Sequence, residues 1–128
     1  MKKFQEYVLE CLQFGVELNQ LNENRINNEK WKFLKVKYNF TNKKLTLKFK
    51  NIHAKLAEFS KKIKHERNEK YILLGQIVDA LEIVIKSSIQ VIETDNYVFV
   101  DEITNSFLKA NELVNEIRNI VKSEKCTD

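Results

Sequence analysis

The segment that decides the fold is EKYILLGQIVDALEIVIKSSIQVIE, residues 69–93. Its aliphatic residues recur at the helical period and cover most of the circumference, so that only a narrow polar strip remains. A helix that is apolar nearly all round belongs at the centre of a domain. Glu82 and Lys86 are spaced for an ion pair one turn apart on the polar strip. The segment therefore predicts a long central helix, with Asn68 as its N-cap.

Composition favours further long helices in a single domain, residues 1–128. The chain has no proline and only two glycines. These residues break helices and build turns, so their scarcity favours helices and argues against a β-sandwich. A chain of 128 residues can bury one core of modest size. Charged residues interrupt every apolar run well before the roughly 20 residues that a membrane span needs, so we expect no membrane partner.

Apolar stripes at the helical period predict three more helices, at about 3–27, 52–66 and 101–123. A run of asparagines at 22–28 predicts the end of the first. Asp101 is the predicted N-cap of the last, and 124–128 is a polar tail. Residues 97–100 are β-prone and predict either a third strand or an apolar lead-in to that helix.

The last helix carries apolar residues at alternating spacings of four and three, between residues 103 and 121. Such a seam packs either on the domain's own core or on a second chain, which makes a homo-oligomer through the 103–121 seam an open alternative. The seam residues are Ile103, Phe107, Ala110, Val114, Ile117 and Val121.

Between the first two helices the apolar period changes from 3.6 to 2. Apolar residues alternate with polar ones over 33–40, and again over 45–50 after the polar stretch 41–44. Two such runs around a short turn predict a β-hairpin at about 33–50, although a lysine-rich helix is the alternative. The predicted fold is therefore mainly α with a minor β element: a small bundle of four helices with an inserted basic hairpin.

Charge is segregated along the chain. Residues 30–64 carry twelve lysines and one acidic residue, whereas the net charge of the whole chain is only +4. The segment also holds six of the thirteen aromatic residues. Lysines displace counterions from phosphates and exposed rings stack on bases, so this composition suits a polyanion. The predicted contact residues are Lys30, Trp31, Lys32, Lys35, Lys37, Lys43, Lys44, Lys48, Lys50, Lys55, Lys61, Lys62 and Lys64.

Two explanations other than binding would also account for the number of lysines in this segment. Lysine on an exposed strand protects it from edge-to-edge aggregation, and the abundance of lysine over arginine also fits a bias in the composition of the coding sequence. The aromatic residues of the hairpin alternate onto the face opposite its lysines, which favours a role in the core. Trp31 fits either environment.

The sequence offers no signature of catalysis or of a bound cofactor. It lacks phosphate-cradling glycine loops and the motifs of metalloproteases, zinc sites and nucleophilic serine enzymes. Asp79 and Glu82 lie one turn apart, an arrangement that is more typical of an exposed helical strip than of acid–base chemistry. Cys11 lies on an apolar stripe, and two cysteines do not make a disulfide framework, which fits a reducing, cytoplasmic location. We expect no enzyme activity, no metal and no cofactor.

These observations predict a small non-catalytic binding protein whose segment 30–64 contacts nucleic acid or another polyanion without sequence specificity. Bidentate reading of guanine favours arginine, which the segment lacks. The alternative is a protein–protein interaction module, such as an inhibitor, an adaptor or an antitoxin-like protein from a mobile element. Its basic segment would face an acidic protein surface, and this steering mainly raises the association rate.

Overall fold

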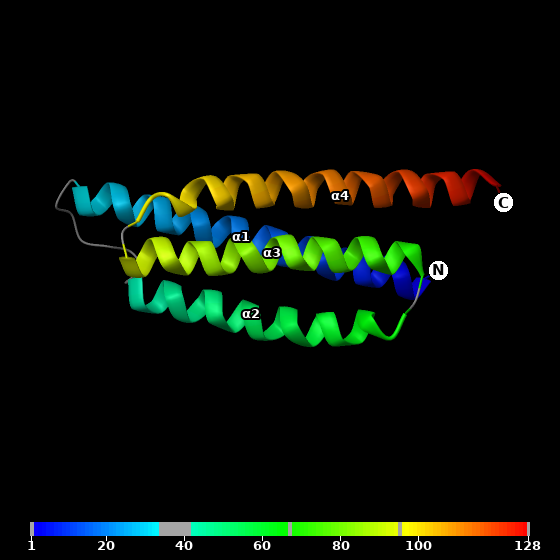
Figure 1. Ribbon diagram of the computed structural model, residues 1–128, viewed down its shortest axis with the longest axis horizontal. Coiled ribbons are helices and arrows are strands. Elements are labelled where there is room, and N and C mark those ends of the chain that lie inside the picture. The colour runs from blue at the N-terminus through cyan, green and yellow to red at the C-terminus, as the bar shows by residue number, and fades with distance from the viewer. Residues whose placement is uncertain (1, 34–41, 67, 95, 128) are drawn as a thin grey trace.

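Four α-helices form a bundle in the computed structural model (Figure 1). They are α1 (Lys2–Phe33), α2 (Asn42–Lys64), α3 (Glu69–Thr94) and α4 (Phe99–Thr127). The structure describes residues 2–33, 42–66, 68–94 and 96–127, and no β-strand occurs within these ranges. The prediction of a mainly α fold built as a small helical bundle is confirmed.

Helix α3 is central, as its all-round apolar character predicts. It contacts each of the other three helices, with α4 along one side and α2 along another (Figure 1). Its residues Leu74 and Val84 are fully buried. Asn68 caps the helix, because its Oδ1 accepts a hydrogen bond from the backbone N–H of Lys70 at 3.3 Å. The observed bounds extend the predicted helix by one residue.

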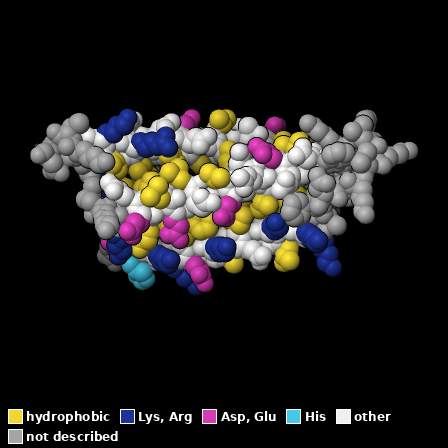
Figure 2. Space-filling model, turned by 180° about the vertical axis from the view of Figure 1, so that it is seen from behind, with side chains coloured by type: hydrophobic (Ala, Val, Ile, Leu, Met, Phe, Trp, Pro, Cys, Tyr) yellow, Lys and Arg dark blue, Asp and Glu magenta, His cyan; other side chains and the backbone are white. Residues whose placement is uncertain are grey.

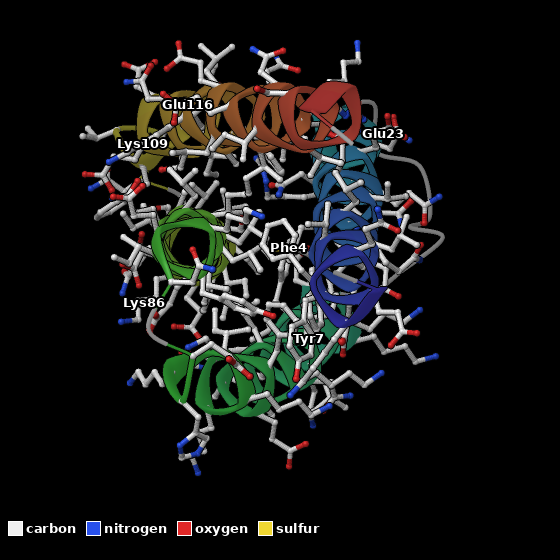
Figure 3. All side chains as sticks on the ribbon, turned by 90° about the vertical axis from the view of Figure 1, so that its right-hand side faces the viewer. Phe4, Tyr7, Glu23, Lys86, Lys109 and Glu116 are labelled. Carbon is white, nitrogen blue, oxygen red and sulfur yellow. The ribbon has the colours of Figure 1, made fainter. Side chains whose placement is uncertain are left out.

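Aromatic side chains join α1 to α2 and α3 inside the bundle. Phe59 of α2 meets the rings of Tyr7 and Phe14 edge to face, with both centroid distances at 5.7 Å. Phe4 meets Tyr71 of α3 in the same way at 5.3 Å. Seen end on, Phe4 and Tyr7 point from α1 into the space between the helices (Figure 3). Such contacts each stabilise by about 1 kcal/mol beyond burial and hold α1 against α2 and α3.

The predicted hairpin is wrong for its second half, since residues 42–50 form the start of α2. The buried residues of α2 follow the helical spacing from Leu45 to Ile63 without interruption. Leu47, which the alternating pattern placed in the core with Leu45 and Phe49, is 59% exposed. Leu45 and Phe49 are therefore an i,i+4 pair on the buried side of a helix, and the apparent alternation with Leu47 was misleading. Of the first predicted strand, 33–40, Phe33 is instead the last residue of α1, and 34–40 lie outside the described residues.

Helix α1 does not end in the asparagine-rich run, because the polar side chains there are buried against the bundle. Asn22, Arg25 and Asn28 are each at most 5% exposed. Arg25 donates from Nε to Oδ1 of Asn22 at 3.0 Å, and the Ser88 hydroxyl of α3 lies 3.0 Å from the same oxygen. These hydrogen bonds offset the weak helix propensity of asparagine and carry α1 on to Phe33.

Helix α4 begins before the predicted N-cap. Oδ1 of Asn96 accepts a hydrogen bond from the N–H of Val98 at 3.1 Å, and the helix starts at Phe99. Asp101 therefore lies in the first turn instead of capping it, and the β-prone run 97–100 leads into the helix. At the other end the helix continues to Thr127, through most of the predicted polar tail. Asp101 still lies where the helix dipole favours an acidic side chain.

The 103–121 seam packs on the domain's own core. Ile103, Ala110 and Ile117 are buried at 6% exposure or less. Phe107, Val114 and Val121 are partly buried against the same core. The first of the two alternatives for this seam therefore describes the fold.

Candidate polyanion-binding face

The described part of the basic segment lies almost wholly on one helix. All eight lysines of α2 are exposed, and Glu58 is the only acidic residue on that helix. Figure 2 shows Lys and Arg side chains along the lower edge of the molecule, where α2 runs. We call these eight residues the lysine face: Lys43, Lys44, Lys48, Lys50, Lys55, Lys61, Lys62 and Lys64.

The spacing of the lysines divides this face into two edges. At 100° per residue, Lys44, Lys48, Lys55 and Lys62 share one side of the helix. Lys43, Lys50, Lys61 and Lys64 fall on the other. Leu47, Ala54 and Glu58, all exposed, occupy the strip between the edges. The face is thus two rows of positive charge on either side of a strip with a single charge.

The remaining predicted contact residues lie outside what the structure describes. Lys30, Trp31 and Lys32 fall in the last turn of α1, where the side chains are not described. Lys35 and Lys37 lie in 34–41. A contribution of these five residues to the site stays a prediction. Within α2, both aromatic side chains are in the core: Phe49 is fully buried and Phe59 is 1% exposed.

One histidine of α2 forms a polar link to α3 beside the lysine face. His53 Nε2 lies 3.4 Å from Oε1 of Glu82, and Lys86 Nζ lies 3.2 Å from the same oxygen. The predicted pair of Glu82 and Lys86 is therefore present. Partial burial raises the pKa of Glu82, but the hydrogen bonds from Lys86 and His53 outweigh it and leave the pKa below its ordinary value. The contact between His53 and Glu82 joins α2 to α3 at the surface of the bundle.

An apolar pocket that the sequence did not reveal lies at the N-terminal end of α2. Its volume is about 700 Å³, and Leu47 and Ile92 line it together with Lys43, Lys44 and Lys50. Glu93 adds the one negative charge among its lining residues. The alternating pattern had assigned Leu47 to the core. Only the helical period of the apolar residues between 45 and 63 would have predicted that Leu47 lies on the surface.

Cys11, Asp79 and Glu82 are the other residues with chemically reactive side chains that the sequence singled out. Cys11 is 2% exposed, and burial, with a smaller effect of Glu10, raises the pKa of its thiol to about 12. Asp79 is exposed, whereas Glu82 is occupied by the link to His53. In the described ranges, no three His, Cys, Asp or Glu side chains are grouped so that they could hold a metal ion.

Comparison with known proteins adds no assignment: no family model, no curated protein and no solved structure matches this chain. None of the helices, over their described residues, is long and apolar enough to cross a membrane.

Proposed function

We propose that this protein binds double-stranded nucleic acid through the lysine face of α2, without sequence specificity. The observation that carries the proposal is the exposure of all eight lysines on a 23-residue helix with a single acidic residue. Lysine supplies point charges that pair with phosphates and release counterions, which gives affinity without reading bases.

The dimensions of α2 favour a duplex. With a rise of about 1.5 Å per residue, the helix is roughly 34 Å long, close to one turn of B-DNA. A helix with its side chains is about 10–12 Å across, and the DNA major groove is about 12 Å wide. The two lysine edges would then face the two phosphate backbones, with Leu47, Ala54 and Glu58 between them.

Within the described part of the basic segment, both aromatic side chains are buried, which favours a duplex over single strands. Single-strand binders usually stack bases on exposed rings, and Phe49 and Phe59 are in the core. Duplex RNA presents a deep, narrow major groove that does not admit a helix, so B-form DNA is the preferred ligand. We expect DNA duplexes to bind more tightly than either single strands or duplex RNA.

The direct test is fluorescence anisotropy with labelled duplexes of about 30 base pairs, at about 50 mM salt. The variant Lys50→Gln/Lys55→Gln removes two charges from the lysine face. The matched control, Lys109→Gln/Arg118→Gln, removes two exposed charges from α4. Binding that is lost in the first variant and kept in the second supports the proposal. Equal losses would mean that only net charge matters, and absence of binding by the wild type would refute it.

A protein partner with an acidic surface is the second candidate, favoured by the pocket around Leu47 and Ile92. Three lysines beside two aliphatic side chains suit an acidic segment that also carries an apolar residue. Leu47→Ser separates the two candidates. It leaves every lysine in place, so duplex binding should persist, whereas a partner seated in the pocket should bind less tightly. Chemical crosslinking with wild-type and Leu47→Ser protein as baits would measure that difference.

A further inference from the structure

The bundle is open along one side, between α1 and α4. These two helices run antiparallel and both pack on α3, but they make at most a marginal contact with each other (Figure 1). A groove of about 430 Å³ lies between them. Ile77 and Leu81 of α3 line the bottom of the groove. Gly15 of α1 and Ala110 of α4, which have small side chains, line its two sides.

Aliphatic side chains project beside this groove into solvent. Leu9 and Val16 on α1 are 65% and 51% exposed, and Leu108 on α4 is 56% exposed. Val16 and Leu108 line the groove itself. Hydrophobic side chains lie together across the middle of the face in Figure 2, above the lysines of α2. A contiguous apolar surface of this kind marks an interaction site.

We propose that a second copy of this chain covers the groove, related by a twofold axis that crosses it perpendicular to the helices. Under this symmetry α4 packs antiparallel on α4 of the second copy, and α1 packs antiparallel on its α1. The two copies present the same surface to each other, as in most homodimers.

The charges along α4 select this symmetry. Asp101, Leu108, Asn115 and Lys122 recur every seven residues and so share one face of the helix. An antiparallel pair centred between Leu108 and Asn115 sets Asp101 opposite Lys122 of the second copy, twice. A twofold axis along the groove would instead pair the acidic beginning of α4 with the acidic part of α1 that contains Glu23.

The same axis matches the apolar residues of α1. Leu9, Val16 and Glu23 also recur every seven residues, and an antiparallel pair sets Leu9 opposite Val16 of the second copy. The midpoint of this pair falls beside Leu12, and the midpoint on α4 falls beside Asn111. Leu12 and Asn111 line the same groove, so one axis serves both helices.

The surface area that the proposed interface would bury agrees with a weak to moderate dimer. The surface from Asp101 to Lys122 is about 33 Å long, and two adjacent helices are about 20 Å wide. Each copy would bury on the order of 600 Å², the lower end of the range for specific interfaces. The interface leaves the lysine face of α2 uncovered, so the dimer does not depend on the proposed nucleic-acid binding and is tested without nucleic acid.

Sedimentation equilibrium from about 1 µM to 1 mM tests the dimer, since this range spans the dissociation constants of a weak to moderate dimer. The variant Val16→Glu/Leu108→Glu should be monomeric over this range and keep its helicity, because both side chains are exposed. Leu47→Glu, an exposed aliphatic outside the groove, is the matched control and should dimerise like the wild type. A wild type that stays monomeric at about 1 mM, or a dimer that survives Val16→Glu/Leu108→Glu, overturns the proposal.

Charge reversal tests the antiparallel arrangement. Asp101→Lys and Lys122→Glu should each raise the dissociation constant about tenfold at low salt, because each sets like charges opposite each other. The double variant should restore the wild-type constant. An equimolar mixture of the two single variants should form heterodimers, because both of their cross-pairs are attractive. Failure of both rescues would overturn the antiparallel arrangement.

Discussion

Ser88 of α3, which is fully buried, holds its hydroxyl oxygen 3.0 Å from Oδ1 of Asn22 on α1. The same hydroxyl lies 2.6 Å from the carbonyl oxygen of Val84, and its one proton serves one acceptor at a time. Oδ1 of Asn22 also accepts from Nε of Arg25. A polar side chain of α1 is thus bonded within its own helix and to the centre of the bundle, which sets the position of α1 along α3.

The first prediction concerns Asn22. Asn22→Ala should lower the free energy of unfolding by about 1–3 kcal/mol, because it removes a buried amide that accepts from Nε of Arg25 and donates from Nδ2 to the carbonyl oxygen of Leu18. Asn19→Ala, at an exposed position three residues earlier, is the control and should change it by less than about 0.5 kcal/mol. Urea unfolding followed by circular dichroism measures both. Equal, small effects would contradict a structural role for the buried amide.

A second prediction separates helix from hairpin in residues 45–50. Phe49→Ala should cost about 3–5 kcal/mol, since Phe49 is fully buried. Leu47→Ala should cost less than about 0.5 kcal/mol, since Leu47 is exposed. In a hairpin both residues would share the apolar face and both substitutions would be costly. Chemical denaturation of the two variants therefore decides between the structures.

This contrast shows where the sequence was informative. Residues 69–93 are apolar nearly all round, and no competing pattern fits them, so α3 and its cap at Asn68 were predictable. Residues 45–49 satisfy both periods, because positions four apart lie on one side of a helix and on one face of a strand. Only the continuation through Ile52 and Leu56 distinguishes the two.

The end of α1 was not predictable, for a different reason. Asn22 has weak helix propensity, and the group that compensates for it, Ser88, is 66 residues away in the chain. The lysines of the candidate face were identifiable by composition, but their division into two edges required α2 to be helical. The groove exists because α1 and α4 scarcely contact each other. The apolar pattern within a single segment does not predict which helices will be neighbours.

The third prediction is a pH effect at Glu82. Its pKa is lower in the folded protein than the ordinary value of 4.5, so folding favours the ionised form. The contribution is complete above about pH 4.5 and is lost as pH falls through the lower folded pKa. The stability difference between wild type and Glu82→Gln should therefore be larger at about pH 6 than at about pH 3. A difference that is constant with pH would contradict the link to Lys86 and His53.

Cys11 provides a fourth prediction. Its thiol is buried and its pKa is raised to about 12, so the reactive thiolate is scarce at neutral pH. In a Cys126→Ser background, labelling by an alkylating reagent should be slow in the native protein and fast in denaturant. Mass spectrometry follows the reaction. Rapid labelling of the native protein would mean that the groove beside Cys11 opens far more than its 2% exposure indicates.

The two lysine edges give a fifth prediction. If α2 lies between two phosphate backbones, Lys44→Gln/Lys48→Gln/Lys55→Gln/Lys62→Gln and Lys43→Gln/Lys50→Gln/Lys61→Gln/Lys64→Gln should weaken duplex binding to a similar extent. Anisotropy titrations of both variants at one salt concentration make the comparison. A loss confined to one edge would show that α2 contacts a single strand with one side.

The salt dependence of duplex binding tests the central claim most directly. If six or more lysines of α2 neutralise phosphates, the slope of log K against log salt should be about −5 or steeper, and affinity should fall by about a thousandfold or more between 50 and 200 mM. Each lysine replaced by glutamine should make the slope shallower by about 0.9. A slope near zero, or one that the lysine variants leave unchanged, would contradict a phosphate-binding role for α2.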